Sequence, residues 1–331
     1  MGSADSKFVT IGGGTGSFML LSALKRHVAN ITAIVNMADS GGSTGILRDE
    51  LGVLPPGDVR QCLVALAPAS SEIRELFNYR FGDGSLSGHS FGNLFLTALE
   101  KMTGSFDEAV KAAGRILNVS GSVVPSTLDD VELVYDAPNG ERIVGESSIT
   151  PRHFVKGERP RLSLLPAAQL NPEAAAAIAD ADVIVVAPGN LYSSLAPTLM
   201  VRGMGEAIAA SGAKVIYVCN LVTKPGQTDG FAVHDFAAEV ERFAGRPILD
   251  YVIYNTHHPS KALLKNYAQH GEYAVQLDQK AAAKAVYQVV PADLLSDTVA
   301  APDPNDKLLK RTLIRHDGEK AAREIIKIDQ S

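Results

Sequence analysis

Short apolar runs rich in β-branched residues recur along the chain and alternate with stretches of helical periodicity. The runs begin at Phe8, Ile31, Asp182, Lys214 and Tyr251. Two of the stretches between or after them, 193–211 and 231–245, carry apolar residues at helical spacing. This alternation indicates βαβ units around a mainly parallel sheet that is buried on both faces. The sequence therefore predicts a Rossmann-like, doubly wound α/β fold.

A long insertion, 38–180, separates the second predicted strand from the third. Its first part, 58–118, is predicted to be mainly helical, and Ser105 and Glu108 occupy the positions of an N-terminal capping box. Its second part contains two alternating runs on either side of Asn139-Gly140, which predicts a hairpin. We interpret the insertion as a subdomain packed beside the sheet.

The predicted domain organisation follows from these patterns. It comprises a single domain, 1–331, an inserted helical and hairpin subdomain at 58–165, a closing helical segment at 306–328, and an N-terminal segment, 1–6, that we expect to be disordered.

Composition narrows the classes of function. Hydrophobic residues make up 46% of the 331 residues, enough to bury a core. The 31 basic and 37 acidic residues give a net charge of −6, which argues against nucleic-acid binding. The two cysteines lack metal-ligand spacing and fit a reducing, cytoplasmic compartment. No apolar run approaches the length of a membrane span.

A glycine-rich turn, IGGGTGS, follows the first predicted strand and precedes a helical pattern. Such a turn lets backbone N–H groups approach an anion at a helix N-terminus. The alternative is a tight turn that only allows close packing of strand and helix. The dinucleotide fingerprint fails, because its third glycine position falls on Ser17 or Met19, and no lysine follows for a P-loop. The candidate phosphate-binding residues here are Gly13, Gly14, Thr15, Gly16 and Ser17.

A second turn of small polar residues, MADSGGSTG, follows the second predicted strand. Ligands of open α/β sheets lie across the carboxyl ends of the strands, so two such turns predict a phosphate-binding crevice. Asp39 can hold a magnesium ion or accept a hydrogen bond from a substrate, or it can bond its own backbone in an Asx turn. Asp58 precedes a helix as a candidate N-cap. The candidate binding residues of the turn are Asp39, Ser40, Gly41, Gly42 and Ser43.

Glycine-bearing polar loops recur elsewhere along the chain. GHSFGN puts Asn93 at the start of a helix, and the loops APGNLYSSL and CNLVTKPGQT follow the next two predicted strands. We expect these loops to meet at one sheet edge. The candidate binding residues among them are Asn93, Gly189, Asn190 and Ser193. The adjacent His257 and His258 are poorly placed to share a metal ion, and no nucleophile motif is present.

Together these motifs resemble one family. IGGGTGS, NMADSGGSTG, PPGDVRQCLVAL, GHSFGNLFL, NVSGSVVPST, APGNLYSSL, CNLVTKPGQT and LIRHD occur in the order seen in the gluconeogenesis factor (YvcK) family, relatives of the phospholactate transferases (CofD). The resemblance covers roughly residues 8–320. It implies a cytoplasmic regulator needed for growth and cell morphology on gluconeogenic carbon sources.

The same resemblance implies a ligand and partners. The ligand is a uridine nucleotide sugar, UDP-N-acetylglucosamine, with Tyr267 stacking on uracil and Arg315 clamping pyrophosphate. A homodimer and a protein partner in cell-wall regulation are further expectations of this resemblance.

The transferase relatives imply an enzymatic alternative. They use aspartates with magnesium at positions that match Asp39 and Asp58, but an acidic residue usually follows the first aspartate, where this chain has Ser40. The alternative is therefore a magnesium-dependent transferase of a phosphate-linked group, with Asp39 and Asp58 as catalytic and metal-binding residues. Magnesium is the one cofactor that the resemblance implies.

Overall fold

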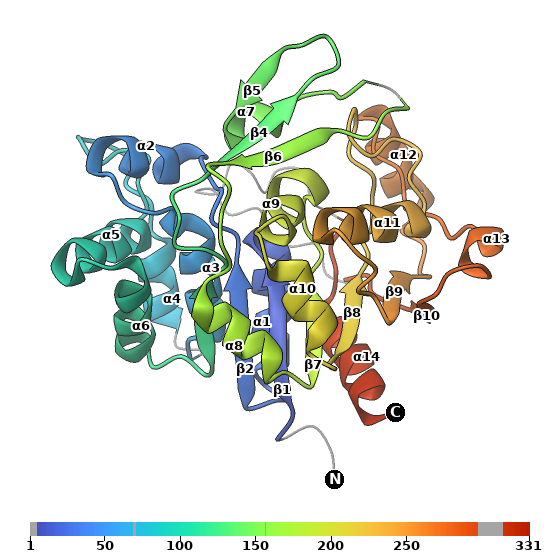
Figure 1. Ribbon diagram of the computed structural model, residues 1–331, viewed down its shortest axis with the longest axis horizontal. Coiled ribbons are helices and arrows are strands. Elements are labelled where there is room, and N and C mark those ends of the chain that lie inside the picture. Colours follow the sequence, from blue (N-terminus) through green and yellow to red (C-terminus); the bar gives the residue numbers. More distant parts are fainter. Residues whose placement is uncertain (1–4, 69–70, 156, 297–313) are drawn as a thin grey trace.

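A seven-stranded parallel sheet forms the centre of the protein, in the strand order β10-β9-β8-β7-β1-β2-β3 (Figure 1). The structure is a computed structural model that describes residues 5–68, 71–155, 157–296 and 314–331. The strands of the sheet are β1 (Lys7–Gly12), β2 (Asn30–Val35), β3 (Ser122–Pro125), β7 (Val183–Val186), β8 (Lys214–Val218), β9 (Tyr251–Asn255) and β10 (Gln288–Ala292).

The strand order confirms the predicted doubly wound α/β fold. All five predicted strands are present as β1, β2, β7, β8 and β9. The sheet grows from β1 toward β3 on one side and from β7 toward β10 on the other, so the chain changes direction between β1 and β7. Ligands of doubly wound sheets bind at the carboxyl edge near such a switch point. The sequence did not predict β3 or β10.

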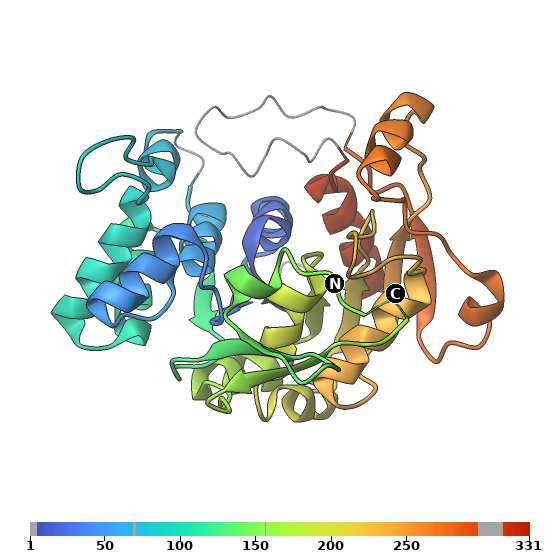
Figure 2. The ribbon, with the colours of Figure 1, turned by 90° about the horizontal axis from the view of Figure 1, so that it is seen from above.

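Helices cover both faces of the sheet (Figure 2). One face is packed by α1, α3, α6 and α14, and the other by α8, η1, α9, α10 and α11. The helices are α1 (Gly14–Leu24), α2 (Gly42–Leu51), α3 (Pro56–Leu66), α4 (Ser71–Asn78), α5 (Phe91–Thr103), α6 (Phe106–Leu117), α7 (Glu146–Ile149), α8 (Pro172–Ala179), the π-helix η1 (Leu191–Leu195), α9 (Ala196–Leu199), α10 (Met204–Ala210), α11 (Val233–Ala244), α12 (Lys261–Gln269), α13 (Gln279–Ala282) and α14 (Gly318–Gln330).

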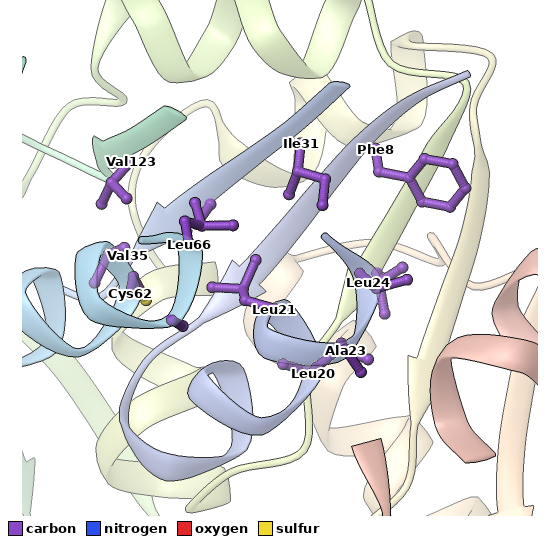
Figure 3. Packing of buried hydrophobic residues seen from close by; sticks show 14 of the residues in the cluster. Phe8, Leu20, Leu21, Ala23, Leu24, Ile31, Val35, Cys62, Leu66 and Val123 are labelled. Carbon is purple, nitrogen blue, oxygen red and sulfur yellow. The ribbon is translucent and has the colours of Figure 1, made fainter. Parts of the chain in front are cut away.

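The core beside α1 fixes the position of the glycine-rich turn. Figure 3 shows Leu21 and Leu24 of α1 on the same side of the sheet as Phe8 of β1 and Ile31 of β2. Each of these side chains is at most 2% exposed. Burying such a side chain contributes about 1.5–3 kcal/mol. The packing therefore holds the N-terminus of α1 at the carboxyl end of β1.

Two predicted helices have different outcomes. The helix predicted at 231–245 is confirmed as α11, whose C-cap is Gly245 with φ +76°. The continuous helix predicted at 193–211 is wrong, because the segment divides into η1, α9 and α10. Gly203 has φ +92° immediately before α10, a conformation that a continuing right-handed helix does not allow.

The helical part of the insertion packs against the central sheet. Helix α3 lies beside α1, and β3 pairs with β2 in the main sheet (Figure 1). The Ser105 hydroxyl accepts the Glu108 N–H at 3.4 Å, whereas the Ser105 N–H donates to Thr103 Oγ1 at 3.3 Å instead of to Glu108. The predicted capping box is therefore half formed. Helix α6 ends at Asn118, where φ is +49°.

The predicted hairpin is confirmed as β4 (Glu132–Asp136) and β5 (Arg142–Val144), joined around Gly140 with φ +87°. With β6 (Arg161–Leu165) these strands form a separate antiparallel sheet in the order β5-β4-β6. In Figure 1 this small sheet lies above the upper ends of the central strands. It therefore brings α7, which directly follows β5, toward the carboxyl edge of the main sheet.

The remaining domain expectations concern the chain ends. Within the closing segment predicted at 306–328, residues 306–313 lie outside the described residues, and the described part forms α14 from Gly318. Residues 1–4 of the N-terminal segment also lie outside them. The division into a domain at 1–331 and a subdomain at 58–165 stays a prediction.

Candidate functional site

The glycine-rich turn holds a carboxylate that belongs to the chain itself. The Gly14 N–H, at the start of α1, donates to Asp58 Oδ1 at 3.0 Å. A Cβ on Gly13 would lie 2.2 Å from Asp58 Oδ2, closer than any side chain tolerates. An anion does occupy the N-terminus of α1, as the motif predicts, but it comes from the first turn of α3.

Close packing explains another part of the glycine motif. A Cβ on Gly16 would lie 1.7 Å from the carbonyl oxygen of Pro188, which follows β7. The turn therefore sits directly at the switch point between β1 and β7. Thr15 is exposed, while Ser17 is 2% exposed and its Oγ has no hydrogen-bond partner among the described residues. Close packing therefore holds for Gly16, whereas binding of a ligand anion by the turn stays a prediction.

Asp39 forms the predicted Asx turn at the carboxyl end of β2. Its Oδ1 accepts the Gly41 N–H at 2.9 Å, and its Oδ2 lies 2.5 Å from where a Cβ of Gly57 would be. Burial raises the pKa of Asp39, and hydrogen bonds from the Gly41 N–H and Thr44 oppose the shift. The glycine at 57 therefore allows the start of α3 to approach this carboxylate.

Asp58 is buried beside Asp39, at 8% exposure. Burial, followed by the charge of Asp39, raises the pKa of Asp58 to about 7, and a hydrogen bond from Asn36 opposes the shift. The N-cap of α3 is Pro55, so the interpretation of Asp58 as the cap of its own helix is wrong. The reason is that Asp58 is the third residue of α3 and bonds α1 instead.

A third carboxylate, Glu146, was not predicted. It is the first residue of α7, and its Oε2 lies 3.9 Å from where a Cβ of Gly41 would be. Burial raises the pKa of Glu146, hydrogen bonds from Thr150 and Ser193 oppose this, and the charge of Asp39 adds to it. Since β5 and α7 are consecutive, the hairpin delivers this carboxylate to the acidic pair.

Lys224 also belongs to this cluster and was not singled out from the sequence. It lies in the loop after β8, and its Nζ is buried with no hydrogen-bond partner among the described residues. Burial lowers the pKa of Lys224 to about 8, and the charge of Glu146 opposes the shift. The sequence motif CNLVTKPGQT marked this loop, but a single lysine in a polar loop carries no spacing signal. We call Asp39, Asp58, Glu146 and Lys224 the edge cluster.

The predicted residues Ser43 and Asn93 belong to a different network. Ser43 Oγ bonds His89 Nδ1 at 3.0 Å and accepts from Asn93 Nδ2 at 3.2 Å. Asn93 Oδ1 accepts from Arg60 Nε at 3.0 Å. All four residues are buried among α2, α3 and α5. We call them the helical-layer network; their polar groups bond one another.

Other predicted binding residues have structural contacts as well. The Ser40 hydroxyl accepts the Ser147 N–H of α7 at 3.1 Å. Asn190 caps η1, where its Oδ1 accepts the N–H groups of Tyr192 and Ser193 at 3.3 and 3.4 Å. The Gly189 carbonyl accepts from Asn220 Nδ2 at 2.7 Å, and Gly42 begins α2. The loops thus meet at the carboxyl edge, where they contact one another.

Tyr267 and Arg315 lie at another part of this edge. Tyr267 is 5% exposed and its hydroxyl accepts the Ile314 N–H at 2.9 Å, so its ring is packed in the core instead of presented for stacking. Ile314 also lines a cavity of about 290 Å³ at the end of β9, together with Asn255, His257 and Gln276. Arg315 follows directly, and its carbonyl accepts the Ser296 N–H at 2.9 Å.

The edge cluster suits a magnesium ion that also binds a ligand better than a metal ion bound by protein side chains alone. Within the described ranges, no group of three or more His, Cys, Asp and Glu side chains is arranged to hold a metal ion. Magnesium, however, commonly binds one or two carboxylates together with substrate phosphates and water. Asp39 and Asp58 form such a pair, and their mutual repulsion is what a divalent cation would relieve.

Comparison with known proteins shows the family of this chain. The family model described as 2-phospho-L-lactate transferase CofD matches residues 8–295. The chain belongs to this family. The CofD-family match includes the glycine-rich turn and all four residues of the edge cluster.

Relatives across bacteria have full-length similarity to this CofD-family chain. A putative gluconeogenesis factor from Thermotoga maritima is 40% identical over 98% of this chain and 99% of that protein. The gluconeogenesis factor of Bacillus subtilis is 34% identical, with 96% of each chain covered. A crystal structure of a UPF0052-family protein from Bacillus halodurans matches with a TM-score of 0.86 and 35% identity, covering 97% of this chain and 99% of that one.

Within the described residues, no helix combines the length and apolar character that crossing a membrane requires.

Proposed function

We propose that this protein is a cytoplasmic gluconeogenesis factor that binds a uridine nucleotide sugar, UDP-N-acetylglucosamine, and supports growth and cell morphology on gluconeogenic carbon sources. The full-length similarity to proteins named gluconeogenesis factor supports the biological role. The observation that carries the binding role is the glycine-rich turn, which opens α1 at the switch point of the sheet beside the edge cluster.

The ligand would lie along the carboxyl edge of the sheet. Its diphosphate would lie beside the turn at 13–17, where Asp58 already bonds the Gly14 N–H and the Ser17 hydroxyl lacks a partner among the described residues. Asp39 would accept hydrogen bonds from sugar hydroxyls. The nucleoside would extend toward the cavity at the end of β9, where Tyr267 bonds the lining residue Ile314. Magnesium, when bound, would neutralise part of the phosphate charge.

Calorimetric titration with UDP-N-acetylglucosamine, UDP and GDP, each with and without magnesium, tests this proposal. We expect the nucleotide sugar to bind more tightly than either nucleotide. Asp58→Asn removes one carboxylate of the acidic pair and should abolish any magnesium dependence, whereas Asp83→Asn, at an exposed position, should leave it unchanged. No heat at millimolar nucleotide sugar would contradict the proposal.

A second candidate is a magnesium-dependent transferase of a phosphate-linked group. The adjacent carboxylates of Asp39 and Asp58 favour it, because two buried acids of this kind can hold a metal ion and orient an acceptor hydroxyl. The name of the family model points the same way. Phosphorus NMR of a nucleotide donor with magnesium and candidate acceptors would detect turnover, which Asp39→Asn should abolish. An unchanged donor spectrum would remove this candidate.

We also propose a homodimer and a protein partner in cell-wall regulation. Small soluble proteins that associate most often form two-fold dimers. Sedimentation equilibrium of the purified protein, with and without UDP-N-acetylglucosamine, would detect a dimer, and a monomer at all concentrations would exclude it.

A further inference from the structure

Lys224 has a buried, charged head group with no hydrogen-bond partner among the described residues. An ammonium group carries three donors and no acceptor. Leaving a buried charged donor unpaired is costly, and native proteins rarely do so. Among the described residues, Lys224 is the one lysine whose Nζ is buried without such a partner. This feature therefore needs an explanation.

The loop of Lys224 is held firmly next to Glu146. Gln227 Nε2 donates to three carbonyl oxygens at the end of α7, those of Ile149 at 3.3 Å, Thr150 at 3.0 Å and Arg152 at 3.1 Å. The Lys224 N–H donates to Thr228 Oγ1 at 2.7 Å. These bonds hold the loop at 224–228 against the end of α7. The fold therefore fixes the position of the lysine beside α7.

The missing contact between Lys224 and Glu146 is the second observation. The charge of Glu146 acts on Lys224, yet Nζ forms neither a hydrogen bond nor an ion pair with it or with any other described residue. The donors of Nζ are therefore not committed to Glu146 and can bind another acceptor. A phosphate oxygen is the acceptor that a lysine commonly binds as a point charge.

Two buried arginines near the edge cluster already have partners. Arg48 bonds the Asp39 carbonyl at 3.1 Å and Asp130 at 2.6 Å, and Arg60 bonds Asn93 at 3.0 Å. Lys224 is the one cation of the edge cluster, and its Nζ has no hydrogen-bond partner among the described residues.

We propose that Lys224 Nζ, in the loop after β8, binds a phosphate group of the ligand. This proposal rests on the proposed function for the identity of the nucleotide, but its chemistry requires only a phosphate oxyanion. The charge of Glu146 opposes the lowering of the Lys224 pKa by burial, which favours the charged lysine. The hairpin subdomain thereby takes part in ligand binding.

Titration of the full chain with two probes tests the proposal. Wild type, Lys224→Met and the matched control Lys284→Met, an exposed lysine, are each titrated with inorganic pyrophosphate and with UDP-N-acetylglucosamine at neutral pH. Loss of a charge-assisted hydrogen bond weakens binding about 10- to 100-fold. We expect this loss of affinity for both probes in Lys224→Met and no change in Lys284→Met.

The outcomes separate the two proposals. Equal nucleotide-sugar binding by wild type and Lys224→Met would overturn the role of Lys224 and leave the proposed function standing. Binding of pyrophosphate that depends on Lys224, without nucleotide-sugar binding, would support the role of Lys224 and contradict the proposed function. Absence of binding of both probes to wild type would overturn both.

A second variant covers the case in which Lys224→Met does not fold. Lys224→Gln keeps a polar head group without the charge and is titrated with pyrophosphate in the same way, with Lys284→Gln as its control. We expect a loss of affinity in Lys224→Gln alone. Equal pyrophosphate affinity of wild type and Lys224→Gln would overturn the proposal.

Discussion

The helical-layer network and the edge cluster are two buried polar clusters that draw residues from the same sequence motifs. They differ in how many of their polar groups have hydrogen-bond partners. In the helical-layer network, Ser43, Arg60, His89 and Asn93 bond one another. In the edge cluster, carboxylates are crowded together and Lys224 Nζ has no hydrogen-bond partner among the described residues. A network whose polar groups bond one another stabilises the fold, whereas buried polar groups without partners can bind a ligand.

The largest expected effect comes from breaking the satisfied network. Asn93→Ala leaves Arg60 Nε and Ser43 Oγ without their shared partner, so we expect the free energy of unfolding to fall by about 2–3 kcal/mol. Urea denaturation measures this loss. Asn266→Ala, an exposed amide on α12, is the control and should change stability little. Weaker ligand binding by folded Asn93→Ala would contradict the structural role given to this residue.

Removing the unpaired charge should have the opposite sign. Lys224→Met replaces a buried, unpaired ammonium by an apolar side chain, so we expect it to raise the free energy of unfolding at neutral pH by about 1–3 kcal/mol. Because the folded pKa of Lys224 is near 8 and the unfolded value is 10.5, the unfolded state binds more protons between them. The stability of wild type therefore rises relative to the variant over that range.

Denaturation of wild type and Lys224→Met at several pH values measures the difference. The advantage of the variant should be constant below about pH 8 and should shrink as the pH rises toward 10.5. A difference that does not depend on pH would mean that the lysine is not held in a buried, charged state.

The smallest expected effect concerns Ser40, which the sequence assigned to phosphate binding. Its hydroxyl accepts the Ser147 N–H at the start of α7, so Ser40→Ala should cost about 0.5–1 kcal/mol of stability. Ser85→Ala, at an exposed turn, is the matched control. A contrary result would be a loss of both stability and pyrophosphate affinity in Ser40→Ala but not in Ser85→Ala. This result would assign Ser40 to the ligand site and reduce the contrast between the two clusters.

The sequence predicted the inner strands of the sheet but not its two outer strands, β3 and β10. The runs at Phe8 and Ile31 are long and β-branched, and they became central strands. Strand β3 has four residues and lies inside the insertion, where no alternation marks it. Strand β10 contains Pro291, which is tolerated because β10 lies at the sheet edge, and this proline weakens the strand pattern in the sequence.

The sequence predicted where the candidate site lies, but it did not predict all of the residues that form it. The glycine-rich turn and Asp39 lie at the expected edge, since motif spacing and strand ends determine where they fall. The tertiary contact between Gly14 and Asp58 could not be read from local sequence, because 44 positions separate the two residues. Glu146 and Lys224 have no motif of their own, and only the packing of the hairpin against the loop after β8 brings them together.

The amide of Gln227 joins two parts of the molecule that have no sequence proximity. By bonding the last carbonyls of α7, it fastens the small antiparallel sheet to the central one. Local opening of either part would break the same bonds, so the two should fluctuate as one cooperative unit. Amide hydrogen exchange in β4, β5 and the loop at 223–228 should therefore slow in concert when a ligand binds, including at residues that never touch it.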